Sequence, residues 1–109
     1  MIQYEDFAKV EMRVGKIIQV GDFPKARKPA YQLTIDFGEY GLKHSSAQIK
    51  EVYKKEELLN RLVIAVTNFP PKQIANFISE VLVLGVNNEK GQVVLLHPDK
   101  EVPLGERVY

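Results

Sequence analysis

The segment Tyr31–Phe37 alternates apolar and polar side chains more regularly than any other part of the chain. Tyr31, Leu33, Ile35 and Phe37 share one face of the predicted strand, and polar residues occupy the other face. Because successive side chains of a strand point to opposite faces, this pattern fits a sheet with one buried and one exposed side. The chain is therefore expected to build its hydrophobic core against a β-sheet.

Five other segments have the patterns of strands. Lys9–Val20 begins with a clear alternation that Gly15 interrupts, and a glycine inside a strand often marks a bulge or a bend. Leu42–Ile49 is polar, and we expect it to be an exposed strand. The remaining predicted strands are Leu62–Thr67, Val81–Val86 and Val93–Leu96.

Only one helix is expected, over Glu51–Arg61. Its apolar stripe consists of Val52, Leu58, Leu59 and Leu62, and charged residues face water. The predicted fold class is all-β. A five-stranded Greek-key barrel with a helix between strands three and four, and with short terminal extensions, is an OB-fold, although periodicity alone also allows another small barrel. The length of 109 residues predicts a single domain over residues 1–109.

The charge balance limits how the chain can bind a polyanion. The formal net charge is only +1, so binding of nucleic acid must depend on a local basic cluster. There is no cysteine, which excludes disulfides and thiolate metal sites. Met1–Asp6 lacks the features of a signal peptide, and the longest apolar stretch, Leu62–Val66, is too short to cross a bilayer. We therefore expect a cytoplasmic protein with no membrane insertion.

The sequence offers little for catalysis. Gly38–Gly41 is not followed by the Lys-Ser or Lys-Thr pair of a phosphate-binding loop. His44 and His97 lie in separate segments and lack the spacing of metal ligands. Ser45 is adjacent to His44, so the two side chains would point to opposite faces of a strand and could not act as nucleophile and base. We expect a non-catalytic protein with no cofactor and no metal site.

Several motifs in order along the chain are similar to a known family. They are Asp6–Phe7 with Val10, Arg13–Ile17, Tyr31–Gly38, Ser45–Ile49, Val66–Ile74 and Ser79–Gly85. Together they resemble the tRNA-binding domain family, and Asp22–Tyr31 resembles the CsaA type within it. The resemblance implies an OB-fold homodimer that binds tRNA-like structures. For the CsaA type it also implies a chaperone role linked to protein export and to the translocase motor.

A basic loop is the first candidate for RNA binding. Lys25, Arg27 and Lys28 lie in the predicted connection between the first two strands, which flanks the ligand groove of OB-folds. On charge alone an ordinary solvated loop is the simpler interpretation, and the resemblance favours contacts with phosphates. The predicted third strand adds Lys43, His44, Ser45, Ser46 and Gln48. A lone exposed histidine more often has no direct role.

Five residues elsewhere are candidates for the same interface: Arg13, Asn68, Lys72, Ser79 and Glu80. Arg13 can meet a phosphate from the groove wall, or it can pair with Glu11 or Asp36. Lys72 is placed for a phosphate. On spacing alone, Asn68 favours capping a turn, and Glu80 favours internal pairing, for instance with Arg13, over reading a base or ribose.

The strands Leu62–Thr67 and Val81–Val86 are apolar on both faces, whereas the outer face of an isolated antiparallel barrel should be polar. The helix and the tail can cover part of this surface, and a second subunit can cover the rest. The predicted dimer interface consists of Val81, Val83, Val94, Leu96, Val102 and Leu104.

Three functions are open at this point. The first is a tRNA-binding protein that recognises shape and phosphates. The second is a chaperone that binds unfolded or pre-secretory polypeptide through Phe69, Ile74 and Phe77, without a physiological RNA role, and the third is a partner that docks on a larger enzyme. The RNA interpretation requires that barrel closure gathers the cations into one concavity. Those cations are Arg13, Lys25, Arg27, Lys28, Lys43 and Lys72.

Overall fold

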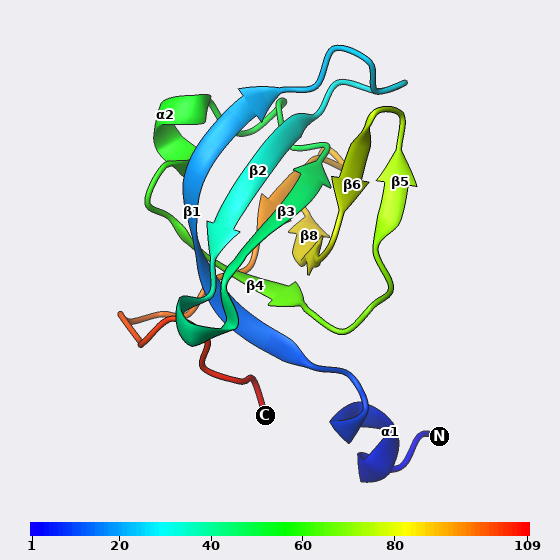
Figure 1. The fold of residues 1–109 in the computed structure, drawn as a ribbon, viewed down its shortest axis with the longest axis vertical. Helices are drawn as coiled ribbons and strands as arrows, with labels where there is room; N and C mark the ends of the chain where they lie inside the picture. The colour runs from blue at the N-terminus through cyan, green and yellow to red at the C-terminus, as the bar shows by residue number, and fades with distance from the viewer.

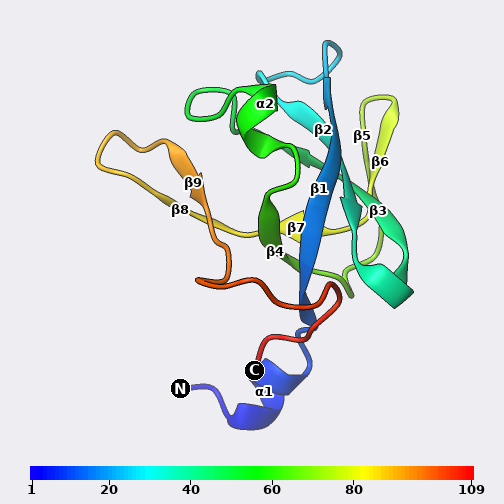
Figure 2. The same ribbon diagram turned by 90° about the vertical axis from the view of Figure 1, so that its left-hand side faces the viewer.

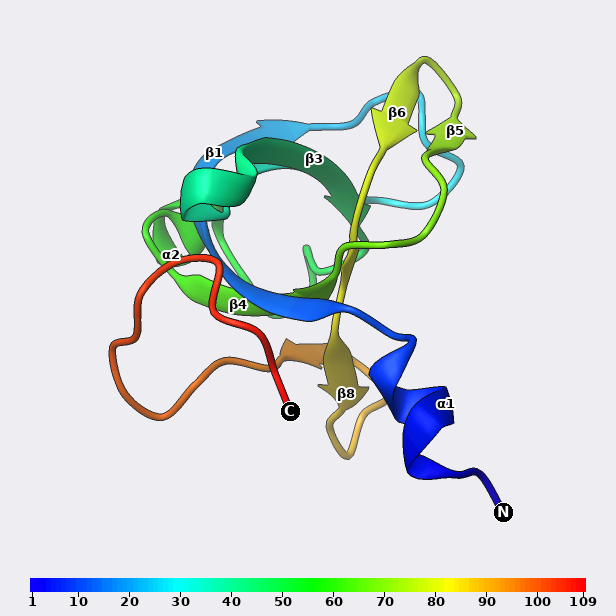
Figure 3. The ribbon, with the colours of Figure 1, turned by 60° about the horizontal axis from the view of Figure 1, so that its bottom comes forward.

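Five antiparallel strands form a nearly closed barrel in the computed structural model, which describes all 109 residues (Figure 1). Their order in the sheet is β3-β2-β1-β4-β7. The strands are β1 (Met12–Asp22), β2 (Tyr31–Asp36), β3 (Leu42–Ala47), β4 (Leu62–Val66) and β7 (Leu82–Val83). Two hydrogen bonds join β3 to the chain just before β7: Glu80 N to His44 O at 2.8 Å, and Ser45 Oγ to Val81 O at 2.9 Å. The ring of strands is visible in Figure 3, and the predicted OB-type barrel is confirmed.

The core lies inside this ring and includes the apolar residues of the alternating segment Tyr31–Phe37, most of which forms β2. Leu33, Ile35 and Phe37 are at most 1% exposed, and each buried side chain of this kind contributes about 1.5–3 kcal/mol. Gly15 lets β1 cross over them, because a Cβ at Gly15 would lie 2.5 Å from Ile35 Cγ2 and 2.7 Å from Phe37 Cε1. β1 does contain an irregularity, but the register shift lies between Ile17 and Gln19 and not at the predicted Gly15, which pairs regularly with Val63.

Two hairpins project from opposite sides of the barrel (Figures 2 and 3). One consists of β5 (Lys72–Ile74) and β6 (Phe77–Ser79), and the other of β8 (Gly85–Asn87) and β9 (Val93–Leu95). The helices are short: α1 (Tyr4–Ala8), α2 (Lys55–Leu58) and the 3-10 turn η1 (Gly38–Tyr40). None of them has the length and apolar character that crossing a membrane requires.

The predicted helix over Glu51–Arg61 is wrong in its extent, because α2 is a single turn. Its start is fixed at Lys54, whose backbone N–H donates to Glu57 Oε1 at 2.8 Å, and Asn60 ends the turn with a φ of 66°. Leu58 is buried as expected, but Leu59 is 45% exposed. The residues before the turn instead bring Tyr53 into the core, where its hydroxyl accepts a hydrogen bond from Leu95 N at 3.0 Å.

The predicted continuous strand Val81–Val86 is also wrong, since it is split into β7 and β8. Leu84 lies between them and bonds in two directions: its N–H donates to Ile64 O at 2.9 Å, and its carbonyl accepts from Leu96 N at 3.1 Å. The chain thus leaves the partner strand β4 and turns to pair with β9. A Cβ at Gly85 would lie 2.8 Å from Val93 Cγ1, so glycine permits this close approach.

The burial of this segment corrects the predicted dimer surface. Val81 is 5% exposed and belongs to the core of its own chain, whereas Leu82 and Val86 are 50% and 54% exposed. Val81 is therefore removed from the candidate interface residues. The others are half-buried or exposed: Val83, Val94, Leu96, Val102 and Leu104.

Candidate nucleic-acid interface

A groove with a volume of about 700 Å³ lies between the β1–β2 loop and the β5–β6 hairpin. The loop supplies Lys25, Arg27 and Lys28, and the hairpin supplies Lys72 on the opposite side. We call it the basic groove; its lining residues are Lys25, Ala26, Arg27, Lys28, Ala30, Ser46, Gln48, Lys72, Gln73, Ile74 and Ala75. No carboxylate is among them. Four of the six predicted cations therefore share one concavity.

These four cations are available to a ligand. All four side chains are exposed. None of them forms an ion pair or a side-chain hydrogen bond with the rest of the chain. Ammonium and guanidinium groups without internal partners are the natural contacts for phosphate oxygens. The arrangement can hold a polyanion.

An aromatic cluster fixes the two walls of the groove relative to each other. The ring of Phe77, on β6, lies 5.4 Å from that of Phe23, at the start of the β1–β2 loop, and 6.1 Å from that of His44, on β3. Phe23 is only 3% exposed, so it anchors the basic loop to the hairpin. Phe23 was not among the predicted site residues, although an aromatic residue beside Pro24 in a polar loop was a usable signal.

The polar strand β3 divides its residues between the core and the surface. Ser46 and Gln48 line the basic groove, as predicted. Ser45 is 1% exposed, and its hydroxyl donates to Val81 O, so it closes the barrel and cannot contact RNA. The prediction of Ser45 as an RNA-binding residue is therefore wrong, because the alternation of β3 turns this side chain inward.

A second hollow, of about 380 Å³, adjoins the basic groove and shares Ser46, Lys72 and Ile74 with it. We call it the apolar pocket; its lining residues are Ser46, Phe69, Pro70, Lys72, Ile74, Ser79, Glu80, Val81 and Leu82. It contains the predicted candidates Ser79 and Glu80. Phe69, which was a candidate groove residue, is 53% exposed here.

Glu80 does pair internally, but with a different partner from the one suggested. Its Oε1 accepts hydrogen bonds from the backbone N–H of His44 at 3.0 Å and lies 3.1 Å from Nδ1 of the same residue. Arg13 is not its partner. The contact holds β3 against the chain before β7, and it leaves His44 at the edge of the interface, with no direct role assigned.

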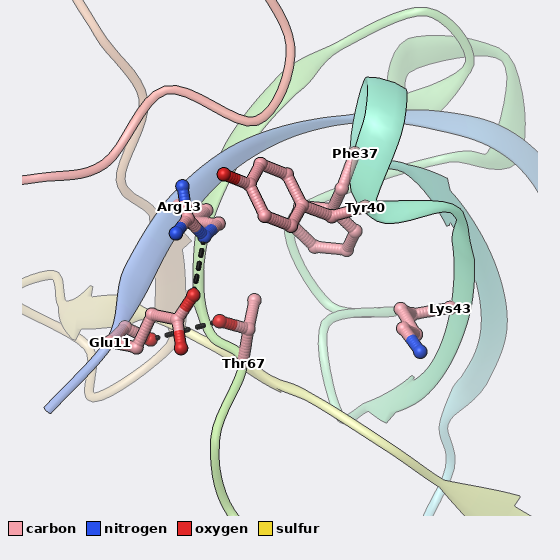
Figure 4. A pocket seen from close by; sticks show the side chains of 6 residues that line it. All are labelled: Glu11, Arg13, Phe37, Tyr40, Lys43 and Thr67. Atoms are coloured by element: carbon pink, nitrogen blue, oxygen red, sulfur yellow. Dashed lines mark hydrogen bonds and ion pairs between the residues drawn. The ribbon is translucent and has the colours of Figure 1, made fainter.

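Arg13 and Lys43 lie in another hollow, at the opposite end of the barrel from the basic loop (Figures 1 and 4). We call this hollow of about 180 Å³ the barrel-end pocket; its lining residues are Glu11, Arg13, Phe37, Tyr40, Lys43 and Thr67. Arg13 Nε donates to Glu11 Oε1 at 2.6 Å, and Nη1 donates to Gly105 O at 2.7 Å. The guanidinium carbon lies 3.8 Å from the centre of the Tyr40 ring. Of the two roles considered for Arg13, the structure favours internal pairing.

Asn68 is likewise engaged inside the molecule. Its Oδ1 accepts from Glu11 N at 3.0 Å, and its Nδ2 donates to Lys9 O at 2.7 Å. The side chain thus satisfies two backbone groups of the segment that leads into β1. This agrees with the capping role favoured from its position.

Lys50 and Lys55 lie near the basic loop but are bound to Asp22, the last residue of β1. Lys55 Nζ and Lys50 Nζ donate to its carboxylate at 2.8 and 3.2 Å. The hydrogen bond from Lys55, followed by that from Lys50, holds the pKa of Asp22 below its usual value, and the carboxylate in turn raises the pKa of Lys55. These two lysines are therefore not equivalent to the four cations of the basic groove.

Among His, Cys, Asp and Glu side chains, no group of three or more is gathered as a metal site would require. Every buried side-chain nitrogen and oxygen has a hydrogen-bond partner. The side-chain polar groups without a partner in the chain are thus at the surface, and those of the basic groove and the apolar pocket are among them.

Comparison with known proteins agrees with this geometry. The family model described as "Putative tRNA binding domain" matches residues 12–107. Methionine–tRNA ligase from Pyrococcus abyssi is 43% identical over 107 residues, which are 98% of this chain and 14% of that protein. The chain thus spans about 14% of the length of the curated relatives that it matches.

Solved structures match over the whole chain. A CsaA chaperone protein from Picrophilus torridus is 58% identical, with a TM-score of 0.93 and complete coverage of both chains. The chaperone CsaA from Bacillus anthracis str. Ames is 49% identical, with a TM-score of 0.94, and the match covers 100% of this chain and 99% of that one. The resemblance to the CsaA type is confirmed.

Proposed function

The chain belongs to the tRNA-binding domain family, and from this premise we propose that it binds tRNA in the basic groove without catalysing a reaction. The observation that carries the proposal is the meeting of Lys25, Arg27, Lys28 and Lys72 in a groove that no carboxylate lines. With a net charge of only +1, the chain has no strong overall attraction for RNA. A local field of four positive charges supplies that attraction at one place.

Recognition by phosphate contacts predicts a steep dependence on salt. We propose to measure binding of bulk tRNA by filter retention over a range of salt concentrations, and to repeat it with Lys25, Arg27 and Lys28 all replaced by alanine. Losing three phosphate contacts should lower affinity roughly a hundredfold at about 0.1 M salt and reduce the slope of log K against log salt by about 2–3.

A matched variant controls for overall charge. Replacing Lys9, Lys54 and Lys90 by alanine also removes three exposed positive charges, but none of these residues lines the groove. This variant should bind tRNA almost as the unchanged protein does. Equal losses in both triple variants, or a salt-independent affinity, would contradict the proposal.

A chaperone role is the second candidate, and exposed apolar side chains favour it. Phe69, Ile78 and Leu82 are 53%, 49% and 50% exposed around the β5–β6 hairpin. Such a surface can hold unfolded or pre-secretory polypeptide, with delivery to the export translocase motor as the finer proposal. The test is suppression of light scattering by a chemically denatured client. The alanine substitutions at Lys25, Arg27 and Lys28 should leave that suppression unchanged.

Homodimer formation is a further part of the proposal. Val86 and Leu96 on the β8–β9 side are 54% and 36% exposed, and Val94 is half-buried there. Pairing of two such surfaces would remove these side chains from water and double the number of grooves. Sedimentation equilibrium should give twice the chain mass of 12.4 kDa. A 12.4 kDa species at micromolar concentration would refute the dimer.

A further inference from the structure

We propose that the apolar pocket accommodates one unstacked RNA base that carries an exocyclic amino group, while the neighbouring phosphates lie in the basic groove. The inference rests on the proposed function, since it names the part of an RNA that this surface distinguishes. It assigns a separate task to each of the two adjoining hollows.

The walls of the pocket suit a flat ring. Phe69 is 53% exposed and Leu82 is 50% exposed, and both line the pocket with Pro70 and Ile74. Stacking on an aromatic side chain stabilises a base whatever its identity, because every base has a π-face. The volume of about 380 Å³ lies within the range of sites for small organic ligands.

The polar groups of the pocket favour a ligand that donates hydrogen bonds. Glu80 uses Oε1 for His44, and its Oε2 has no partner in the chain. An ionised carboxylate only accepts hydrogen bonds. The hydroxyl of Ser46 donates to no protein group, and that of Ser79 makes only one long contact, 3.4 Å to Val81 O. These hydroxyls can adapt to either kind of partner. Lys72 also lines the pocket, but we assign its ammonium to the phosphates of the adjoining groove, so the carboxylate decides which base edge is accepted.

A carboxylate at this place separates uracil from the other bases. Cytosine, adenine and guanine each carry an amino group that can donate to Glu80, as cytosine N4 does to acidic side chains in other complexes. Uracil has a single ring N–H flanked by two carbonyl oxygens, and those oxygens would face the negative charge. The pocket should therefore select against uracil.

The link between the two hollows points to a nucleotide as the occupant. Lys72, Ser46 and Ile74 line both, so a ligand that fills the pocket passes directly into the field of the four groove cations. A nucleotide joins a flat base, which can stack on apolar side chains, to a phosphate over such a short distance. An apolar peptide segment would use the pocket but gain nothing from the cations.

The test compares two labelled RNA octamers by fluorescence anisotropy: one of uridine only, and one with a single cytidine near its centre. The unchanged protein should bind the cytidine octamer about tenfold more tightly. Glu80→Gln keeps an oxygen that can accept from His44 N, but its amide also donates to uracil oxygens. This variant should bind the uridine octamer at least as well and lose most of the preference. A thermal melt checks that it is folded.

A second pair of variants tests the stacking wall. Phe69→Ala should weaken binding of the cytidine octamer by about tenfold. Ile78→Ala removes an equally exposed apolar side chain of the hairpin that does not line the pocket, and it should change little. A similar loss in both variants would overturn the assignment of Phe69 as the stacking surface.

Equal binding of the two octamers by the unchanged protein would overturn the base pocket. If tRNA binding still fell in the Lys25, Arg27 and Lys28 variant, the proposed function would stand without the base pocket. If the unchanged protein showed no salt-dependent tRNA binding, both proposals would be refuted. If Phe69→Ala abolished chaperone activity and left the octamers unaffected, the pocket would be a polypeptide site, and the proposal of a base would be wrong.

Discussion

Arg13 and Lys72 both carry a positive charge in a hollow of the same barrel, yet only Lys72 is free to meet a ligand. In the barrel-end pocket, Arg13 contacts Glu11, Gly105 and the ring of Tyr40. In the basic groove, Lys72 and the three cations of the loop face no carboxylate. A basic residue in a hollow is therefore not by itself a binding residue. The partners within its own chain decide whether its charge is already used.

The difference follows from what surrounds each charge. The Arg13 side chain is 13% exposed, and a guanidinium so far removed from water must be paired. It joins β1 to the tail, since its hydrogen bond to Gly105 spans nearly the whole chain. The groove cations stay hydrated, so leaving them unpaired costs the fold little, and their hydration is given up only when phosphates replace it.

The largest effect is expected from Arg13→Ala, which tests the structural half of this comparison. The substitution removes two charge-assisted hydrogen bonds and the contact of the guanidinium with the Tyr40 ring, and it should lower the free energy of unfolding by about 2–3 kcal/mol. Urea denaturation measures this loss. The affinity of the folded fraction for tRNA should change by less than about twofold. A selective loss of tRNA binding with unchanged stability would move Arg13 into the interface.

Lys72→Ala tests the other side of the comparison, namely that an unpaired cation of the basic groove is free to bind RNA. It removes one unpaired cation from the groove, so tRNA affinity should fall by roughly fivefold at about 0.1 M salt, with a reduction of just under one in the salt slope. Stability in urea should be unchanged, because the side chain is exposed and makes no internal hydrogen bond. Filter binding and denaturation of the same preparation give both values. A loss of stability would show that the Lys72 side chain contacts another part of the chain.

Ser45→Ala and Ser46→Ala sharpen the comparison to two neighbours on one strand. Ser45 donates to Val81 O at 2.9 Å inside the barrel, and its loss leaves a buried carbonyl without that partner. We expect a cost of about 1 kcal/mol in urea denaturation. Ser46 lines both hollows of the interface, so Ser46→Ala should leave stability unchanged and alter only RNA affinity. The opposite distribution of effects would reverse the inward and outward assignments of β3.

The sequence predicts the barrel well because the dominant forces are periodic. The alternation from Tyr31 to Phe37 identifies β2 and its buried face, and turn residues separate it from its neighbours. Prediction from the sequence fails where contacts between residues distant in sequence override the local pattern. The apolar run Val81–Val86 contains no polar residue, yet Leu84 bonds to both Ile64 and Leu96, and these bonds split the strand just before Gly85.

The candidate site shows the same division. The basic loop was predicted from three cations within four residues together with the family resemblance, and Lys72 was predicted from its position in the segment that joins the fourth and fifth strands. Pairing of Glu80 with His44 was not predicted, because their positions differ by 36 and no periodicity relates them. The role of Phe23 in holding the loop was missed for a similar reason: its partner Phe77 lies on a hairpin far along the chain.

The smallest effect is expected at Asp22, at the end of β1 beside the basic loop. Its hydrogen bonds to Lys55 and Lys50 hold the pKa of Asp22 below 3.8, so the contact stabilises the folded state above that pH and is lost as the pH falls through the lower folded-state pKa. The pKa of Lys55 is raised above 10.5, so its share persists below that pH and disappears only in stronger alkali. Asp22→Asn should therefore lower the urea midpoint slightly at about pH 7 and not at strongly acidic pH.

The same substitution releases two lysines beside the basic loop from their partner, so it also tests whether internal pairing keeps a cation from binding RNA. If pairing with Asp22 keeps these lysines from binding RNA, Asp22→Asn should tighten tRNA binding modestly at low salt. Asp99→Asn is the control, since Asp99 is 96% exposed and lies 3.7 Å from its only partner, Lys100. Tighter binding in both variants would reflect net charge alone. Tighter binding only in Asp22→Asn would show that internal pairing keeps Lys50 and Lys55 from the ligand.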